Sequence, residues 1–103
     1  MYQVNYLPSA IGDMVEIVTY IRHTLQNPHA ATKTMYALHN GAEGLRQFPY
    51  ANPAHFPQRP LEHEYRKLLI GSYLMFYWIE EETKTVTVSR VVYAARDYEK
   101  SLR

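Results

Sequence analysis

The carboxylates and histidines of the chain are the side chains whose spacing could support acid–base or metal chemistry. Asp13 and Glu16 stand three positions apart, so a helix would place both on one face, as paired catalytic carboxylates require. A place close to a helix N-terminus, where negative charge is favoured, is more typical of a solvated helix face. Among the histidines, His29 and His39 are too far apart along a helix to share a metal ion. We therefore expect no metal site and no cofactor.

Charge and cysteine content narrow the class of protein. The formal net charge is only +1, which is low for a general nucleic-acid-binding protein. Six basic residues could still gather into a local patch: Arg22, Arg59, Arg66, Lys67, Arg90 and Arg96. No cysteine is present, which excludes disulfides, thiolate metal sites and cysteine nucleophiles. Without an apolar run of roughly 20 residues or a signal-peptide pattern, we expect a cytoplasmic protein that does not enter a membrane.

The N-terminal half carries one strand pattern and two helix patterns. Tyr2 to Tyr6 alternates apolar and polar residues, which predicts a short strand with one buried face. Ser9 is a favoured N-cap, and apolar residues then recur at helical spacing, so we expect an amphipathic helix from Ser9 to about Gln26. Asn27-Pro28 predicts the start of a second helix that ends before Pro49. The short connection favours an antiparallel helical hairpin.

The C-terminal half carries three strand patterns. The first is Tyr65 to Ile70, followed by the hairpin turn signal Gly71-Ser72. The second, Tyr73 to Ile79, is almost continuously apolar and is expected to be a central strand buried on both faces. After the polar segment of residues 80–84, Thr85 to Tyr93 forms the third, and Arg96 to Leu102 could add a short helix.

The element order β-α-α-β-β-β indicates one α+β domain over residues 1–103. We expect the helical hairpin to pack on one face of a mostly antiparallel four-stranded sheet. Residues 50–60 form the one long connection and hold three prolines. We expect this loop to be ordered, with Phe48, Tyr50 and Phe56 as its anchors, and long ordered loops are often functional.

The C-terminal half carries several short motifs in a fixed order. Tyr65-Arg66 opens a strand, an aromatic strand follows Gly71-Ser72, and Arg96-Asp97-Tyr98 stands near the end. The opening "YQVNYLPSA" and the helix ending "LRQFP" agree in kind. In this order and spacing, the chain resembles the RelE/ParE superfamily of toxins from bacterial type II toxin–antitoxin systems. The resemblance implies a cognate antitoxin as partner, with operator DNA bound only indirectly through that antitoxin.

RelE-like members cleave messenger RNA in the ribosome, which requires groups that transfer protons and stabilise phosphate. By position in the family pattern, Arg66 and Arg96 are the candidate phosphate-binding residues here, and Tyr98 or Tyr93 would assist. Three other positions at which the family places proton-transfer or phosphate-binding residues hold leucine: Leu68, Leu74 and Leu102. Leucine can do neither, so the resemblance does not favour cleavage.

A related branch of the superfamily uses glutamate, arginine and histidine for the same reaction. His63 lies between Glu62 and Glu64, and a carboxylate and an imidazole can share acid–base work. A short charged segment of this kind before a strand is more typical of a solvated turn.

ParE-like members are not ribonucleases and inhibit DNA gyrase, which needs a binding surface and no proton relay. The low net charge and the Arg96-Asp97-Tyr98 ending favour this branch, with DNA gyrase as the expected target and the ribosome with its messenger RNA as the alternative. A third possibility is a non-toxic member that only binds its antitoxin. The expected target-binding residues are in the last third of the chain: Arg90, Tyr93, Arg96, Asp97 and Tyr98.

The antitoxin is expected on apolar residues left exposed by the helical hairpin. In this superfamily an antitoxin segment wraps the toxin, and a helix laid in a groove contacts apolar anchors at helical spacing. The candidate antitoxin-binding residues are Met14, Tyr20, Met35, Tyr36 and Tyr50. The same side chains could instead pack the hairpin onto the sheet, and different residues could serve each role.

Overall fold

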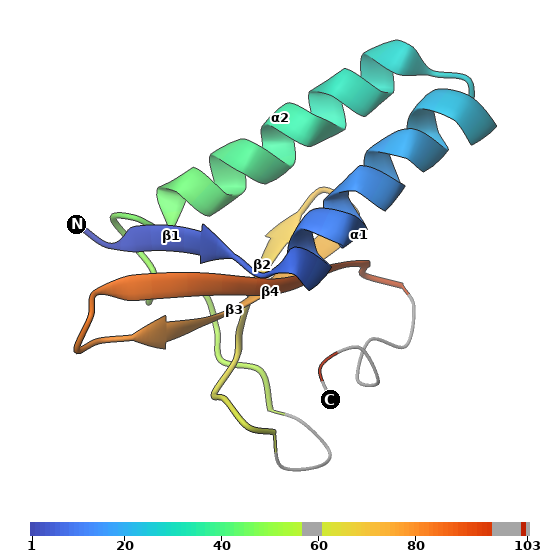
Figure 1. The fold of residues 1–103 in the computed structure, drawn as a ribbon. Helices are drawn as coiled ribbons and strands as arrows, with labels where there is room; N and C mark the ends of the chain where they lie inside the picture. The colour runs from blue at the N-terminus through green and yellow to red at the C-terminus, as the bar shows by residue number, and fades with distance from the viewer. Residues whose placement is uncertain (57–60, 96–101, 103) are drawn as a thin grey trace.

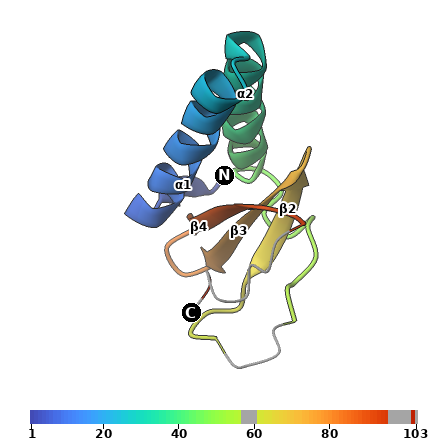
Figure 2. The same ribbon diagram turned by 90° about the vertical axis from the view of Figure 1, so that its right-hand side faces the viewer.

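The backbone forms one four-stranded sheet with two helices stacked on one of its faces (Figures 1 and 2). A computed structural model describes residues 1–56, 61–95 and 102. In chain order the elements are β1 (Gln3–Tyr6), α1 (Pro8–Thr19), a π-helical turn η1 (Tyr20–Thr24), α2 (Pro28–Gly44), β2 (Arg66–Ile70), β3 (Tyr73–Glu80) and β4 (Thr85–Tyr93). The predicted α+β architecture is confirmed. The predicted C-terminal helix falls outside the described residues, except for Leu102.

The sheet has the strand order β1-β4-β3-β2 and is mixed. β1 pairs with β4 in parallel, while β4 with β3 and β3 with β2 are antiparallel. The helical hairpin carries the chain from β1 at one edge of the sheet to β2 at the other edge, and the chain then returns through β3 to β4, which lies parallel to β1. β3 therefore lies between two strands, as its continuous apolar sequence predicts. Gly71, with φ of +57°, makes the tight turn that leads from β2 into β3.

The start of α1 differs from the sequence-based expectation. Pro8 occupies the first turn, and Leu7 stands at the N-cap position without a side-chain cap hydrogen bond. The prediction that Ser9 caps the helix is wrong, because its hydroxyl donates to the carbonyl of Ser89 at 2.7 Å. Proline fixes φ near the helical value and has no N–H to satisfy, so this helix starts without a serine cap.

The end of the first helix also departs from regular α-geometry. Instead of continuing to Gln26, the helix widens into the π-helical turn Tyr20–Thr24, in which the N–H of Leu25 donates to the carbonyl of Tyr20 at 3.1 Å. Gln26 then takes a φ of 52°, in the left-handed region. These two irregularities replace the last turn that the apolar spacing predicted.

α2 begins as predicted and passes close over the sheet. The Asn27 side chain accepts a hydrogen bond from the Ala30 N–H at 3.1 Å, and Pro28 occupies the first turn. Near the other end of α2, a Cβ atom placed on Gly41 would lie 2.5 Å from the Cδ1 atom of Ile70. A glycine here costs some helix stability but lets α2 approach β2.

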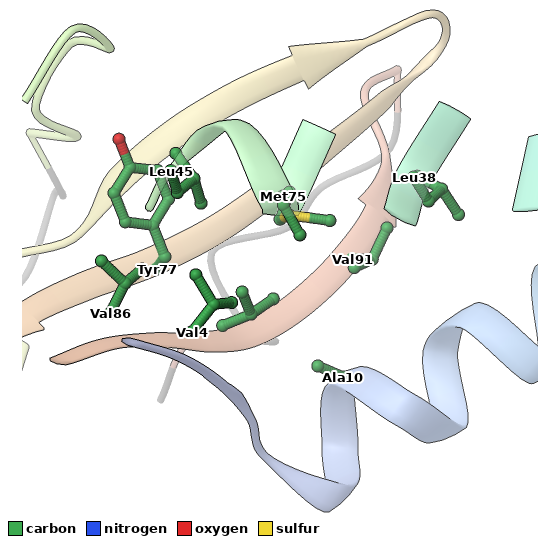
Figure 3. Packing of buried hydrophobic residues seen from close by; sticks show 10 residues of the cluster. Val4, Ala10, Leu38, Leu45, Met75, Tyr77, Val86 and Val91 are labelled. Atoms are coloured by element: carbon green, nitrogen blue, oxygen red, sulfur yellow. The ribbon is translucent and has the colours of Figure 1, made fainter. Parts of the chain in front are cut away.

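Buried side chains lie on both faces of the sheet. The main core lies between the sheet and the helices and is made of Val4, Ala10, Leu38, Ala42, Leu45, Met75, Tyr77, Val86, Val88 and Val91 (Figure 3). A second cluster lies on the opposite face and is made of Tyr65, Phe76, Val92 and Leu102. Neighbouring residues of β3 alternate between these clusters, as the period of a strand requires.

The loop after α2 is held by contacts that the sequence did not suggest. Phe48 and Phe56, two of its expected anchors, are 67% and 88% exposed, so the prediction is wrong for these two residues, whereas Tyr50 does contact Glu81 and Arg66. The loop is also fixed by its backbone: the carbonyl of Pro49 accepts a hydrogen bond from the buried Tyr77 hydroxyl at 2.6 Å, and the carbonyl of Asn52 accepts one from a β2 arginine at 2.7 Å. Within residues 1–56, 61–95 and 102, no helix is long and apolar enough to span a bilayer.

Candidate binding surfaces

The positions expected to carry messenger-RNA cleavage lie on two different faces of the sheet. Arg66 and Leu68 are on the helical side, and Leu68 packs against the main core. Leu74 is on the other side, where it packs against the second cluster with Leu102, itself only 7% exposed. The three leucines therefore serve as packing residues.

Arg66 itself is engaged with the loop after α2. Its Nη1 atom donates to the carbonyl of Asn52 at 2.7 Å, and its guanidinium carbon lies 5.0 Å from the centre of the Tyr50 ring. Such a contact combines a charge-assisted hydrogen bond with a cation–π interaction. Arg66 thus holds the loop against the start of β2. The other two candidates for cleavage, Arg96 and Tyr98, lie outside the described residues.

His63 is part of an aromatic group on the face of the sheet away from the helices. Its ring stacks on Trp78 with centroids 3.7 Å apart and planes 4° apart, and Tyr65 meets both rings edge-on. The flanking Glu62 and Glu64 are exposed. Because its ring face is covered, the principal contact of His63 is packing. Within the part of the chain that the structure describes, no cluster of His, Asp and Glu side chains is arranged to hold a metal ion.

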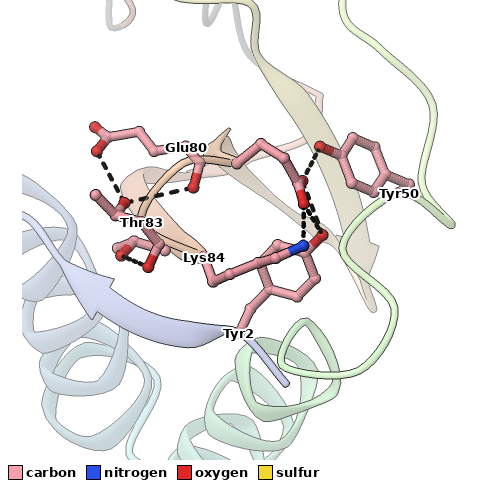
Figure 4. A network of polar contacts seen from close by, with 7 residues as sticks. Tyr2, Tyr50, Glu80, Thr83 and Lys84 are labelled. Carbon is pink, nitrogen blue, oxygen red and sulfur yellow. Dashed lines mark hydrogen bonds and ion pairs between the residues drawn. The ribbon is translucent and has the colours of Figure 1, made fainter.

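A polar network around Glu81 joins three distant segments (Figure 4). The Glu81 carboxylate pairs with Lys84 and accepts hydrogen bonds from the hydroxyls of Tyr50 at 2.6 Å and Tyr2 at 2.8 Å. Together these donors, Lys84 first, hold the pKa of Glu81 at about 2. A carboxylate that is ionised at all ordinary pH values cannot donate a proton. The network therefore joins the N-terminus, the loop and the β3–β4 turn and does not suit acid–base work.

A groove between α1 and α2 has an almost entirely apolar lining. This helical groove has a volume of about 380 Å³ and is lined by Tyr6, Ile11, Met14, Val15, Val18, Thr19, Met35, Leu38 and His39. Ile11, Val15 and Met35 are exposed, at 50%, 61% and 46%. Two of the five predicted antitoxin-binding residues, Met14 and Met35, lie in it.

The three tyrosines predicted to bind the antitoxin are elsewhere. Tyr36 is exposed on α2 and is not among the groove residues. Tyr50 belongs to the Glu81 network. Tyr20 lines a different hollow, between α1 and β4. The structure therefore brings two of the five side chains together on one surface.

Side chains of α1 cover the edge of β4 at the point where β1 ends. The Ser9 hydroxyl donates to the carbonyl of Ser89 at 2.7 Å, and the Asp13 carboxylate accepts from the N–H of Val91 at 2.9 Å. Asp13 also binds both Nε and Nη2 of Arg90, at 2.7 and 2.9 Å, and raises the pKa of that guanidinium. The expectation of a solvated Asp13 is wrong, since only 12% of its side chain is exposed. These contacts give hydrogen-bond partners to backbone groups of β4 that would otherwise be unpaired at the strand edge.

The hollow between α1 and β4, called the tyrosine hollow from here on, has a volume of about 640 Å³. It is lined by Asp13, Glu16, Ile17, Tyr20, Leu25, Tyr73, Arg90, Val91, Val92 and Tyr93. Two of the predicted target-binding residues, Arg90 and Tyr93, lie here, with Tyr93 half exposed and Arg90 bound to Asp13. The other three, Arg96, Asp97 and Tyr98, lie outside the described residues.

The residues that sequence reasoning missed are polar ones with distant partners. Ser9 and Asp13 both bond to β4, which is almost 80 positions further along the chain. Glu81 looked like one of several turn carboxylates, and nothing in its neighbours signals that Tyr2 and Tyr50 reach it. One available signal was the serine in β4: Ser89 interrupts a valine-rich strand at a bulge, where the register shifts opposite Phe76 and Tyr77.

The family of the chain follows from a sequence comparison. The family model described as ParE toxin of type II toxin-antitoxin system, parDE, matches residues 4–98. The chain belongs to the ParE toxin family. The match extends from β1 to beyond β4, so it includes all residues of the helical groove and the tyrosine hollow.

Solved structures with the same fold come from both halves of the superfamily. A chain of the chromosomal ParDE toxin–antitoxin system of P. aeruginosa superposes with a TM-score of 0.72 at 16% identity, covering 90% of this chain and 96% of the other. A chain of the RelBE2 complex of Mycobacterium tuberculosis gives 0.64 at 22% identity, covering 89% and 96%. One of the RelE–RelB complex of Pyrococcus horikoshii gives 0.61 at 11%, covering 93% and 98%. At these identities the likeness establishes the fold that this ParE family member shares with them. No curated protein sequence matches the chain.

Proposed function

We propose that this ParE family toxin acts in the cytoplasm by inhibiting DNA gyrase and that a cognate antitoxin neutralises it. The family match supports a toxin of a type II system. The observation that carries the choice of gyrase over messenger RNA is the packing of Leu68, Leu74 and Leu102 into the hydrophobic clusters of both sheet faces. Cleavage needs proton donors and acceptors around one phosphate, and these three positions supply neither.

The remaining polar groups also fit a binding toxin better than a nuclease. Arg66 is engaged with the loop backbone, and the Glu81 carboxylate is ionised and saturated with donors. Surface contact with an enzyme target needs exposed side chains on a rigid support, and Tyr93 at the end of β4 meets this requirement.

In the first test, the purified toxin should block supercoiling by DNA gyrase and should leave messenger RNA intact on translating ribosomes. Tyr93→Ala should weaken gyrase inhibition by about tenfold, as expected for an exposed aromatic contact, whereas Tyr36→Ala on α2 should leave it unchanged. Substitution is preferable to truncation at Arg96, because truncation would also remove the buried Leu102. Ribosome-dependent cleavage without gyrase inhibition would instead assign the RelE-like activity, which the structural likeness to RelE chains keeps as the second candidate. Absence of growth arrest on induction would indicate a non-toxic antitoxin-binding protein.

We infer that the antitoxin places an amphipathic helix in the helical groove. Support comes from the apolar lining, the exposure of Val15, Ile11 and Met35, and the relatives, which were solved as toxin–antitoxin complexes. A helix that buries apolar side chains in a groove gains most from a few central contacts. Operator DNA would then be reached only through the antitoxin.

Val15→Asp should weaken antitoxin binding by about 30-fold or more, because it places a carboxylate in an apolar contact. Valine and aspartate have similar helix propensities, and Val15 is 61% exposed, so the fold should be retained. The matched control is Leu69→Asp, at an equally exposed apolar residue of β2 that lies outside the groove. Calorimetry with the antitoxin encoded beside the toxin would measure both. Equal binding by Val15→Asp and the wild type would contradict the placement.

A further inference from the structure

The tyrosine hollow combines three phenol rings with an excess of negative charge. Tyr20 comes from the π-helical turn, and Tyr73 and Tyr93 come from the start of β3 and the end of β4. The rings of Tyr73 and Tyr93 have centroids 6.1 Å apart at an interplanar angle of 68°, so they form two walls of different orientation. Tyr20 and Tyr93 are 54% and 50% exposed, so their ring faces are available to a ligand.

The phenol of Tyr73 is neutral at physiological pH. Burial, with the neighbouring phenols of Tyr93 and Tyr20, raises the pKa of Tyr73. Neutral aromatic rings present negative electrostatic potential on their faces and attract cations. Ligand pockets commonly have volumes of roughly 300–1,000 Å³, and the hollow, at about 640 Å³, has ample room for one long side chain.

One of the two carboxylates that line the hollow forms no ion pair with a described residue. Asp13 is committed to Arg90 and to the N–H of Val91. Glu16, one turn further along α1, lines the hollow and forms no ion pair with any residue that the structure describes. Among the described residues that line the hollow, two carboxylates therefore face the one guanidinium of Arg90, whose pKa Asp13 and, to a smaller extent, Glu16 raise, and this net negative charge favours a further cation.

Two departures from regular backbone geometry frame this hollow. At one end the π-helical turn sets the positions of Tyr20 and Leu25, which both line it. At the other end the bulge in β4 at Ser89 precedes Arg90. π-turns and β-bulges redirect side chains and are frequent at functional sites. Their occurrence at both ends of the same hollow is the second observation that singles it out.

We propose that the tyrosine hollow binds the side chain of an arginine or lysine residue presented by a protein partner, with the cation between the tyrosine rings and against Glu16. The hollow lies on the opposite side of α1 from the helical groove, since Asp13, Glu16 and Ile17 line it while Ile11, Val15 and Val18 line the groove. Recognition of a basic side chain here is independent of whether gyrase is the target.

The direct test uses two amino-acid derivatives with capped, uncharged ends, whose side chains differ in charge. Nα-acetyl-arginine methylamide should give saturable shifts of the ring signals of Tyr20, Tyr73 and Tyr93 in an NMR titration, with a dissociation constant in the millimolar range. Nα-acetyl-citrulline methylamide has nearly the same shape but no charge, and its affinity should be lower by about fivefold or more. Equal affinity for both probes, or no saturable shift with the arginine probe, would overturn the proposal.

Variants separate cation binding from general adhesion to a surface. Glu16→Gln and Tyr20→Leu should each weaken arginine-probe binding by about threefold to tenfold. Tyr20→Phe keeps the aromatic ring and should bind the probe as tightly as the wild type. Glu82→Gln and Tyr36→Leu are the matched controls, because both positions are exposed and outside the hollow. Neither change should alter the affinity for the arginine probe. A Tyr20→Leu variant that bound the arginine probe as tightly as the wild type would also overturn the proposal. Because the assay contains only the toxin and a probe, its result does not depend on gyrase inhibition.

Discussion

Tyr77→Ala is expected to lower the free energy of unfolding by about 3–5 kcal/mol, the range for deleting a large aromatic side chain from a core. Tyr77 is fully buried between Leu45, Val86 and their neighbours in the main core (Figure 3). Its hydroxyl also donates to the carbonyl of Pro49 at 2.6 Å and accepts from the Asn52 side chain at 3.2 Å. Domains of this size are stable by roughly 5–15 kcal/mol, so a large share of the total would be lost.

A companion variant, Tyr77→Phe, isolates the hydroxyl. It keeps the ring in the core and leaves the Pro49 carbonyl without its donor, so the expected loss is about 1–2 kcal/mol. Urea unfolding followed by tryptophan fluorescence measures both variants, with the exposed Tyr36→Phe as the control that should behave as wild type. The loop should also become more sensitive to protease in the phenylalanine variant. If Tyr77→Phe were as stable and as protease-resistant as the wild type, the hydroxyl would not be what fixes the loop.

Local sequence patterns determine most of this fold. The alternation in Thr85 to Tyr93, the apolar run after Gly71-Ser72 and the cap at Asn27 each depend on neighbours within a few positions, and the structure contains all three of these features. The failures occur where two local signals compete. Ser9 and Pro8 both mark a helix start, and proline prevails because its fixed φ needs no cap hydrogen bond.

The binding surfaces were less predictable because their contacts join residues far apart in the chain. Helical spacing correctly groups Met14 with other apolar residues of α1, but it does not distinguish the two sides of that helix, which face different hollows. Tyrosine is harder to assign, since the same type of side chain is a buried anchor at Tyr77, donates a hydrogen bond to a carboxylate at Tyr50 and lines a hollow at Tyr93. Only the tertiary neighbours of each ring decide among these roles.

Asp13 offers the sharpest test of such a long-range contact, and Asp13→Ala is expected to destabilise the protein by about 2–3 kcal/mol. The change removes the Asp13 carboxylate from the partly buried guanidinium of Arg90 and leaves the N–H of Val91 without its acceptor. Removing one partner of a buried pair costs more than the pair contributed, because the remaining charge stays desolvated. Asp13→Asn should recover part of the loss, since an amide oxygen can still accept from the Val91 N–H.

The pair formed by Glu43 and Arg46 is the natural control. Its N–O distance is 2.7 Å, the same as for Asp13 and Arg90, but the Glu43 carboxylate is 38% exposed, against 12% for Asp13, and its partner is only three positions away at the end of α2. Exposed pairs contribute little and are screened by salt. Glu43→Ala should therefore lower the thermal midpoint far less than Asp13→Ala, and added salt should shrink only the former effect. Equal, salt-sensitive losses at both positions would mean that Asp13 acts as an ordinary surface charge and does not close the edge of β4.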